Sequence, residues 1–129
     1  MIMLVVIDTN ILVSALWSKN GAPAQILSQI ISGRLIPCYD YRILGEYRDV
    51  LQRPKFQFSA AEVNALLGWF VDNGRLVIAE PLEIEFTDIA DKKFYEVAKF
   101  CQAPLITGNI RHFPADELVC TVAEFLQKF

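Results

Sequence analysis

The sequence predicts one α/β domain over residues 1–129, with three α/β/α layers around a central parallel sheet of four to five strands. Its length of 129 residues is typical of a single compact domain. The first apolar run, residues 3–7, is continuous and rich in β-branched side chains, as in a strand that is covered on both faces. Short apolar runs then alternate with helical segments, which favours parallel strands connected by helices.

The first half of the chain supplies two expected strands and three expected helices. The strand at residues 3–7 ends at Asp8, and the next apolar repeat has helical spacing over residues 26–31 and stops before Gly33. Residues 35–38 form a second short strand. Helical spacing then resumes over residues 43–51, and Pro54 ends this helix. It resumes again over residues 63–71, after a capping-box pattern at residues 59–62 and before Gly74.

The second half of the chain continues the alternation. A third strand is expected at residues 76–79, followed by a helix that begins at Thr87 and Asp88 and carries an apolar stripe as far as Cys101. Residues 105–106 form a fourth strand, and residues 118–120 form a fifth if they pair. Thr121 then opens a C-terminal helix with a second capping-box pattern.

Composition limits the classes of function that are possible. Apolar residues make up 53% of the chain, which excludes wholesale disorder, and the net charge of −3 argues against a basic coat for nucleic acids. The longest apolar run, residues 1–7, is far too short to span a membrane and has no basic leader, so we expect a cytoplasmic protein without a membrane partner. The three cysteines are widely spaced and are expected to be buried thiols.

Acidic and amide side chains follow the expected strands at the edge where parallel sheets gather reactive groups. Asp8 comes directly after the first strand and Asn109 comes shortly after the fourth. The alternative for Asp8 is a residue that ends the strand and caps the next turn.

Two further acids lie on helices. At about 100° per residue, Glu46 falls at the edge of its helix's apolar stripe, and Asp91 falls beside the stripe of the helix that begins at Asp88. The alternative for Glu46 is an ion pair with Arg42, and the alternative for Asp91 is stabilisation by the helix dipole.

Brought together, Asp8, Glu46 and Asp91 would repel one another unless a divalent cation neutralised them. Oxygen-rich sites prefer Mg²⁺ or Mn²⁺, which lowers the pKa of bound water and stabilises charge on a phosphate. Phosphodiester hydrolysis is therefore the expected reaction.

Four ordered motifs together span nearly the whole length of the chain. They are VVIDTNILVSAL at 5–16, LGEYRDVLQRPKF at 44–56, DIADKKFYEVA at 88–98 and LITGNIRHFP at 105–114. With these motifs the chain is similar to PIN-domain ribonucleases, in particular the PIN-type toxins of prokaryotic toxin–antitoxin pairs. The resemblance implies a metal-dependent endoribonuclease in which Asp8, Glu46 and Asp91 are the catalytic acids and hold Mg²⁺ or Mn²⁺.

The resemblance also implies roles for the polar groups beside these motifs. The groups expected to orient the acids or approach the scissile phosphate are those of Thr9, Asn10, Ser14 and Thr107, although Thr9 and Thr107 could equally serve turns and caps. Lys19 and Arg111, which are close in sequence to Asp8 and Asn109, are the better candidates for binding RNA phosphates.

The sequence departs from the PIN pattern at one position. Many PIN nucleases carry a fourth acid after the Thr-Gly step, whereas this chain has Asn109, whose carbonyl could still accept a hydrogen bond from metal-bound water. Asp116 could replace the missing acid only if its loop folds inward. His112 is expected to pack in its loop rather than act as a general acid.

Partners follow from the same resemblance. An RNA substrate, a cognate antitoxin and a homodimer are expected. The aromatic residues near the middle helices are candidates for the dimer contact, although at least half of them are expected in the core: Phe56, Phe58, Trp69 and Phe70. Two alternatives remain open, a PIN-like module that binds RNA or protein without cleaving it and a receiver-type phosphosignalling domain, which the lone Asp8 fits poorly.

Overall fold

The computed structural model describes residues 2–129, which form one five-stranded parallel sheet in the order β3-β2-β1-β4-β5. The central strand β1 pairs Val5 with Pro37 on one side and Val6 with Leu105 on the other. Val5, Val6 and Ile7 are fully buried, which explains the continuous apolar run. The strands are β1 (Met3–Ile7), β2 (Leu35–Tyr39), β3 (Arg75–Leu76), β4 (Leu105–Ile106) and β5 (Val119–Cys120).

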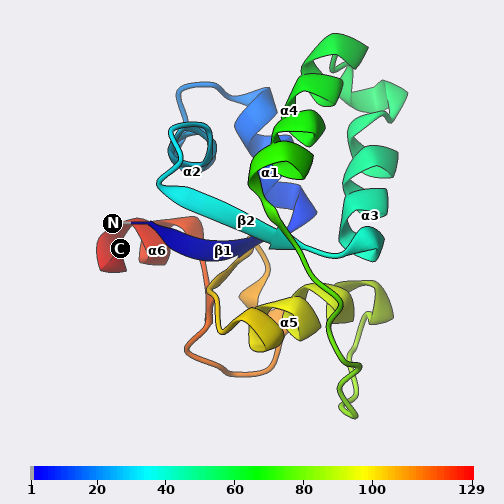
Figure 1. Ribbon diagram of the computed structural model, residues 1–129, viewed down its shortest axis with the longest axis vertical. Helices are drawn as coiled ribbons and strands as arrows, with labels where there is room; N and C mark the ends of the chain where they lie inside the picture. The colour runs from blue at the N-terminus through cyan, green and yellow to red at the C-terminus, as the bar shows by residue number, and fades with distance from the viewer. Residues whose placement is uncertain (1) are drawn as a thin grey trace.

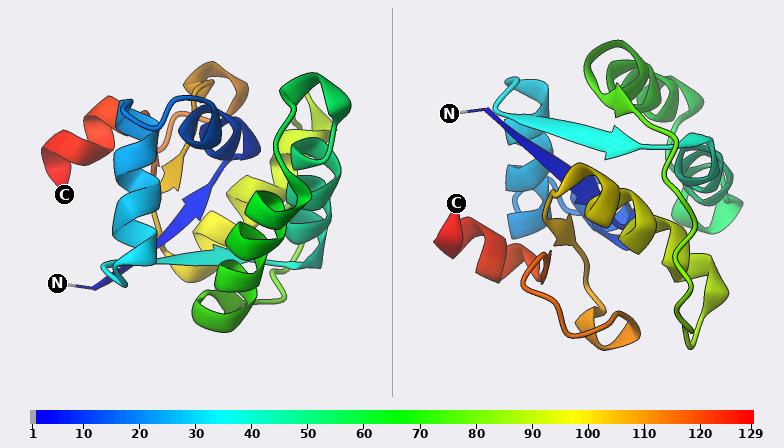
Figure 2. Two further views of the ribbon diagram at one scale, coloured as in Figure 1. Left: turned by 90° about the horizontal axis from the view of Figure 1, so that it is seen from above. Right: turned by 60° about the horizontal axis from the view of Figure 1, so that its bottom comes forward.

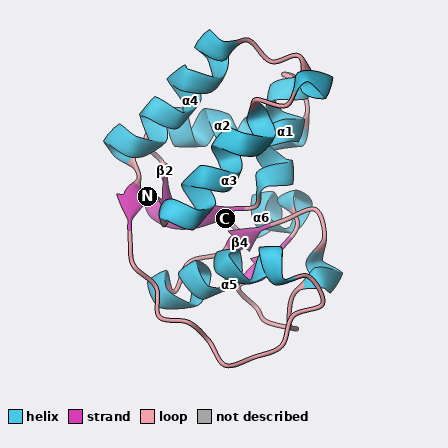
Figure 3. Cartoon of the chain, turned by 90° about the vertical axis from the view of Figure 1, so that its right-hand side faces the viewer, coloured by secondary structure: helices cyan, strands magenta, loops and turns pink. Residues whose placement is uncertain are grey.

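Six α-helices cover the sheet and confirm the three-layer α/β/α fold within the described residues. Helices α1 to α4 lie on one face and α5 lies on the other (Figures 1 and 3). From below, α5 crosses β1 (Figure 2). The helices are α1 (Thr9–Trp17), α2 (Ala22–Ile31), α3 (Tyr41–Leu51), α4 (Ala60–Asn73), α5 (Ile89–Cys101) and α6 (Val122–Lys128), with short 3-10 helices η1 (Pro54–Phe56) and η2 (Ile110–His112).

Side-chain caps begin α4, α5 and α6 at the residues that the sequence predicts. Asp88 accepts from the amide of Ala90 at 3.0 Å, and Ser59 accepts from the amide of Glu62 at 3.0 Å. Thr121 and Glu124 form a reciprocal capping box at α6. At α4 only half of the predicted box forms, because the Glu62 carboxylate pairs with Lys19 instead.

Two segments differ from the predicted elements. Helix α1 is absent from the predictions, and it buries Ile11, Leu12 and Ala15 directly after Asp8. The third strand, predicted at 76–79, is only β3. The amide of Val77 still bonds Tyr39 O at 2.9 Å, but the chain then leaves the edge of the sheet, and Ile78 is 85% exposed.

The departing segment, residues 77–88, is held by a buried carboxylate on α5. Glu96 accepts 2.8 Å hydrogen bonds from the amide of Leu82 and from Arg42, whose guanidinium also binds Asp40. Glu96 lies on the face of α5 opposite its apolar stripe, which would face solvent on an isolated helix, but this segment covers it. Glu96 is 4% exposed.

The cysteines carry no disulfide among the described residues. Cys38 and Cys120 are buried and Cys101 is half-buried, and all three are free thiols, as the sequence predicts. Within residues 2–129, no helix is both long and apolar enough to cross a membrane.

Candidate functional site

Asp8 lies at the carboxyl end of the central strand and is 6% exposed. Its amide bonds Ile106 O at 3.0 Å, which aligns it with the end of β4. Asp8 occupies the N-cap position of α1, yet its side chain makes no capping hydrogen bond. The alternative role as a turn cap is therefore wrong, and the carboxylate is directed elsewhere.

Thr107, directly after β4, positions this carboxylate. The hydroxyl of Thr107 donates to Asp8 Oδ2 at 2.7 Å and accepts from the amide of Asn109 at 3.0 Å, and the residue is fully buried. Thr107 thus serves both the acid and the turn. Asn109 itself is exposed and does not cap η2.

Asn10 lies against Gly108 in the same turn region. A Cβ at Gly108 would approach Asn10 Nδ2 to 3.3 Å, so the glycine permits this close contact. The Oδ1 atom of Asn10 is buried and has no hydrogen-bond partner among the described residues. A buried acceptor without a partner costs free energy, and here it marks a place where a ligand could bind.

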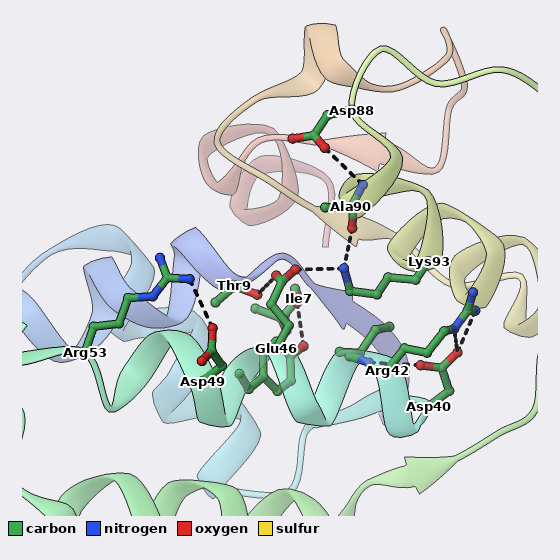
Figure 4. Close-up of polar contacts among 12 residues, drawn as sticks. Ile7, Thr9, Asp40, Arg42, Glu46, Asp49, Arg53, Asp88, Ala90 and Lys93 are labelled. Atoms are coloured by element: carbon green, nitrogen blue, oxygen red, sulfur yellow. Dashed lines mark hydrogen bonds and ion pairs between the residues drawn. The ribbon is translucent and has the colours of Figure 1, made fainter.

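Glu46 reaches the site from α3. Lys93 Nζ lies 2.7 Å from Glu46 Oε1, and the Thr9 hydroxyl donates to Glu46 Oε2 (Figure 4). Lys93 also donates to Ala90 O. The alternative pair between Glu46 and Arg42 does not form, because Arg42 binds Asp40 and Glu96. Asp49 and Arg53 do form the exposed pair that their spacing predicts, at 3.1 Å.

Asp91 reaches the site from the first turn of α5 on the opposite face of the sheet. Its carboxylate lies 3.2 Å from His112 Nδ1. Burial and the nearby Asp88 raise the pKa of Asp91, while His112 opposes this shift. His112 is thus a partner of an acid rather than only a packing residue of its loop.

The electrostatics of Asp8 connect the three acids. The pKa of Asp8 is raised to about 6, chiefly by burial and also by the charges of Asp91 and Glu46, while the hydrogen bond from Thr107 opposes the rise. The carboxylates therefore repel one another across one region. Even so, no three His, Cys, Asp or Glu side chains within residues 2–129 are grouped closely enough to hold a metal ion.

A sequence profile of the PIN domain matches residues 4–111, from β1 into η2. The chain belongs to the PIN domain family. A protein of Methanocaldococcus jannaschii, named only as uncharacterized, is 31% identical over 108 residues, which cover 81% of this chain and 70% of that protein. No solved structure gives a significant match. PIN domains are in general nucleases, and this membership removes the receiver-type alternative.

The phosphate-binding candidates of this PIN domain differ in position. Arg111 is exposed in η2, next to His112. Lys19 does not lie beside Asp8, because α1 carries it away to pair with Glu62 on α4 at 3.5 Å. Ser14 is exposed on α1, one turn beyond Asn10.

Asp116 does not replace the missing fourth acid. It accepts hydrogen bonds from Tyr95 at 2.7 Å, from Lys99 at 2.9 Å and from the amide of Leu118 at 2.9 Å. The amide of Leu118, Tyr95 and Lys99 together lower its pKa to about 2. Asp116 therefore ties its loop to α5 as a structural carboxylate.

Sequence reasoning missed the role of Lys93. The sequence assigns Lys93 no part in the site, whereas its side chain is only 13% exposed and pairs with Glu46. The available signal was its position two residues after Asp91 on a helix expected to face the acids. No sequence pattern links it to Glu46, which is 47 residues away.

Proposed function

We propose that this PIN domain is a metal-dependent endoribonuclease that hydrolyses RNA phosphodiester bonds, with Mg²⁺ or Mn²⁺ held by Asp8, Glu46 and Asp91. The observation that carries the proposal is Asp8, a buried carboxylate at the end of the central strand whose pKa is raised to about 6 by burial and by two further acids. A cation would relieve this unfavourable burial of negative charge.

The residues present fit such an ion in their chemistry. The three carboxylates and the unpartnered Asn10 Oδ1 offer oxygen atoms only, the ligands that Mg²⁺ and Mn²⁺ prefer. Lys93 already places one positive charge on Glu46 at 2.7 Å. An ion that binds Glu46 must displace Lys93 or bind Glu46 together with it. The pairing of Glu46 with Lys93 is our explanation for three acids that face one region without being grouped closely enough to hold a metal.

The side chains of the domain would prepare the site before RNA binds. Thr107 fixes one oxygen of Asp8, and Thr9 holds one oxygen of Glu46. The side chains of Asn109 and Arg111 are both exposed and would be available to bind the substrate. A bound Mg²⁺ or Mn²⁺ would supply a water of lowered pKa and stabilise charge that develops on the phosphate.

The proposal is tested by RNA cleavage. Purified protein is incubated with end-labelled single-stranded RNA in Mg²⁺, in Mn²⁺ and in EDTA. We expect cleavage that requires the metal and is lost in Asp8→Asn, but retained in Asp116→Asn, which makes the same change of charge at a structural carboxylate. Cleavage that persists equally in Asp8→Asn would exclude the proposed site.

A catalytically inactive binding module is the second candidate. Lys93 pairs with Glu46 and His112 contacts Asp91 without a metal, and Asn109 replaces an acid found in many PIN nucleases. This candidate predicts RNA or protein binding that Mg²⁺ does not change, and no cleavage in the assay above.

The toxin role extends the first proposal. An antitoxin would inhibit the domain by placing a basic side chain among the acids, and the contact between Lys93 and Glu46 supports the view that this region accepts an ammonium group. Co-expression with the product of the adjacent gene, followed by cleavage assays of the complex, tests this role. Loss of cleavage in the complex supports it, and full activity contradicts it.

A homodimer is the remaining proposed assembly. Of the four aromatic candidates, Phe70 is fully buried in the core, and Trp69 is half-buried with its indole donating to Ile30 O at 3.2 Å. Phe56 and Phe58 remain half-exposed. Light scattering of the purified protein measures the oligomeric state directly, and a monomer at micromolar concentration contradicts the dimer.

A further inference from the structure

An aromatic cluster lies at the end of α1 that is remote from Asp8. Trp17, the last residue of α1, is 62% exposed. Its ring centroid lies 5.8 Å from that of Phe56 and 6.1 Å from that of Phe58, with the planes nearly perpendicular. Phe56 and Phe58 stack on each other at 5.7 Å. These two phenylalanines hold the exposed indole in place.

The cluster is connected to the acids along α1. Asn10, Ser14 and Trp17 are spaced by four and three residues, so they lie along one face of the helix. Eight residue steps at about 1.5 Å each separate Thr9 from Trp17 by about 12 Å. A polar stripe thus leads from the unpartnered Asn10 Oδ1 to the exposed indole.

The segment from α3 to η1 follows the same course. Thr9 donates to Glu46 at the acidic end, and Trp17 contacts Phe56 at the other end. Helix α1 and the segment 46–56 therefore lie side by side from the acids to the aromatic cluster. A bound polymer that extends from the acids along this course would reach Trp17.

The charges around the cluster favour a polyanion. Lys55 is exposed, its Nζ lies 5.1 Å from the centroid of the Phe56 ring, and it has no ion-pair partner among the described residues. Arg53 is two residues away and neutralises Asp49, the acid on this course. Cations interleaved with exposed aromatic rings are the combination that binds single-stranded nucleic acid.

We propose that Trp17, supported by Phe56 and Phe58 and flanked by Lys55, is a stacking platform for a base of single-stranded RNA, a few nucleotides from the bond that is cut. The platform rests on the proposed function for its substrate class. It adds a binding subsite outside the acidic region, which would set how much RNA the domain must engage.

Tryptophan fluorescence tests the platform without requiring cleavage. The chain has two tryptophans, so Trp69→Phe leaves Trp17 as the single indole reporter. In this variant, combined with Asp8→Asn, we titrate a short oligouridine and the same oligomer with abasic residues. We expect the oligouridine to quench Trp17 emission and the abasic oligomer to bind at least several-fold more weakly with little quenching.

Substitutions then separate stacking from stability. Trp17→Ala is expected to weaken the binding of labelled oligouridine about ten-fold, whereas Trp17→Tyr should retain most of the native affinity. Lys55→Ala is expected to reduce the salt dependence of oligouridine binding. Phe100→Ala removes a ring that is 55% exposed on α5, on the other face of the sheet, and is expected to have no effect. Circular dichroism confirms that each variant is folded.

The outcomes distinguish the platform from the nuclease proposal. If the native protein cleaves RNA and Trp17→Ala binds oligouridine as tightly as the native protein does, the platform is overturned and the nuclease proposal stands. Quenching by RNA in a protein that never cleaves leaves the platform standing and refutes the nuclease. Trp17 emission that changes with protein concentration but not with RNA shows that a second copy covers the indole, which also overturns the platform.

Discussion

The hydroxyl of Thr107 donates a 2.7 Å hydrogen bond to Oδ2 of Asp8, across a sequence separation of 99 residues. This bond joins the ends of β1 and β4 and orients the buried carboxylate on which the account depends. It also offsets part of the cost of burying that carboxylate, since it lowers the pKa of Asp8.

Thr107→Val tests this orientation. Valine has nearly the same shape but cannot donate, so one oxygen of Asp8 loses its partner, and we expect the pKa of Asp8 to rise. Cleavage should fall about ten-fold or more, and the free energy of unfolding should fall by about 1–2 kcal/mol. Thr107→Ser, which keeps the hydroxyl, should retain most activity, and equal loss in both variants would show that packing alone is responsible.

Asp8→Asn should stabilise the metal-free protein at neutral pH. The pKa of Asp8 is raised from 3.8 to about 6, so the folded state disfavours the charged carboxylate. Stability from this group is present below about pH 4 and is lost as the pH rises through about 6. Urea unfolding in EDTA should therefore show Asp8→Asn more stable than the native protein by about 2–3 kcal/mol at pH 7, with the difference vanishing near pH 4.

Asp116→Asn is the matched control and should have the opposite sign. The pKa of Asp116 is lowered to about 2, so its contribution is present above about pH 4 and is lost as the pH falls through about 2. We expect a loss of about 1 kcal/mol at pH 7. The interpretation of Asp8 is wrong if both substitutions destabilise the protein equally at neutral pH.

Lys93→Met should strengthen divalent-metal binding. Lys93 pairs with Glu46 at 2.7 Å, and its removal leaves the acids without this internal cation. Calorimetric titration with Mn²⁺ should show affinity raised about ten-fold, while the metal-free protein loses about 1 kcal/mol of stability. Lys99→Met removes the same charge beside Asp116 and should leave Mn²⁺ affinity unchanged. Weaker Mn²⁺ binding in Lys93→Met would show instead that this ammonium helps to organise the site.

The general fold could be predicted because its signals are local. The continuous apolar run of β1 and the caps at Ser59, Asp88 and Thr121 depend on neighbouring residues only, and each element lies where these signals predict it. Helix α1 was not predicted because the Asp-Thr-Asn sequence at its start is equally typical of a turn. The side chain of its N-cap residue, Asp8, accepts a hydrogen bond from Thr107 and does not cap the helix.

The candidate site could be predicted only in part. The sequence predicts that Asp8, Glu46 and Asp91 face one region. In the structure the charges of Asp91 and Glu46 raise the pKa of Asp8, so both acids lie near enough to influence it. The pairing of Lys93 with Glu46 and the position of Lys19 depend on contacts between distant segments. Such contacts follow from helix packing, which the periodicity of a single sequence does not encode.

The burial of Glu96 illustrates the same limit. Helical angles assign it to solvent, but the irregular segment after β3 folds back over α5 and supplies the amide of Leu82. An irregular segment has no periodicity, so its course could not be predicted.

The most direct measurement is anomalous X-ray diffraction from crystals soaked in Mn²⁺. We predict one strong peak among Asp8, Glu46 and Asp91, with carboxylate oxygens about 2.0–2.5 Å from the ion and Lys93 displaced from Glu46. No peak at this position, with Lys93 still bound to Glu46 at saturating Mn²⁺, would contradict the metal-dependent nuclease.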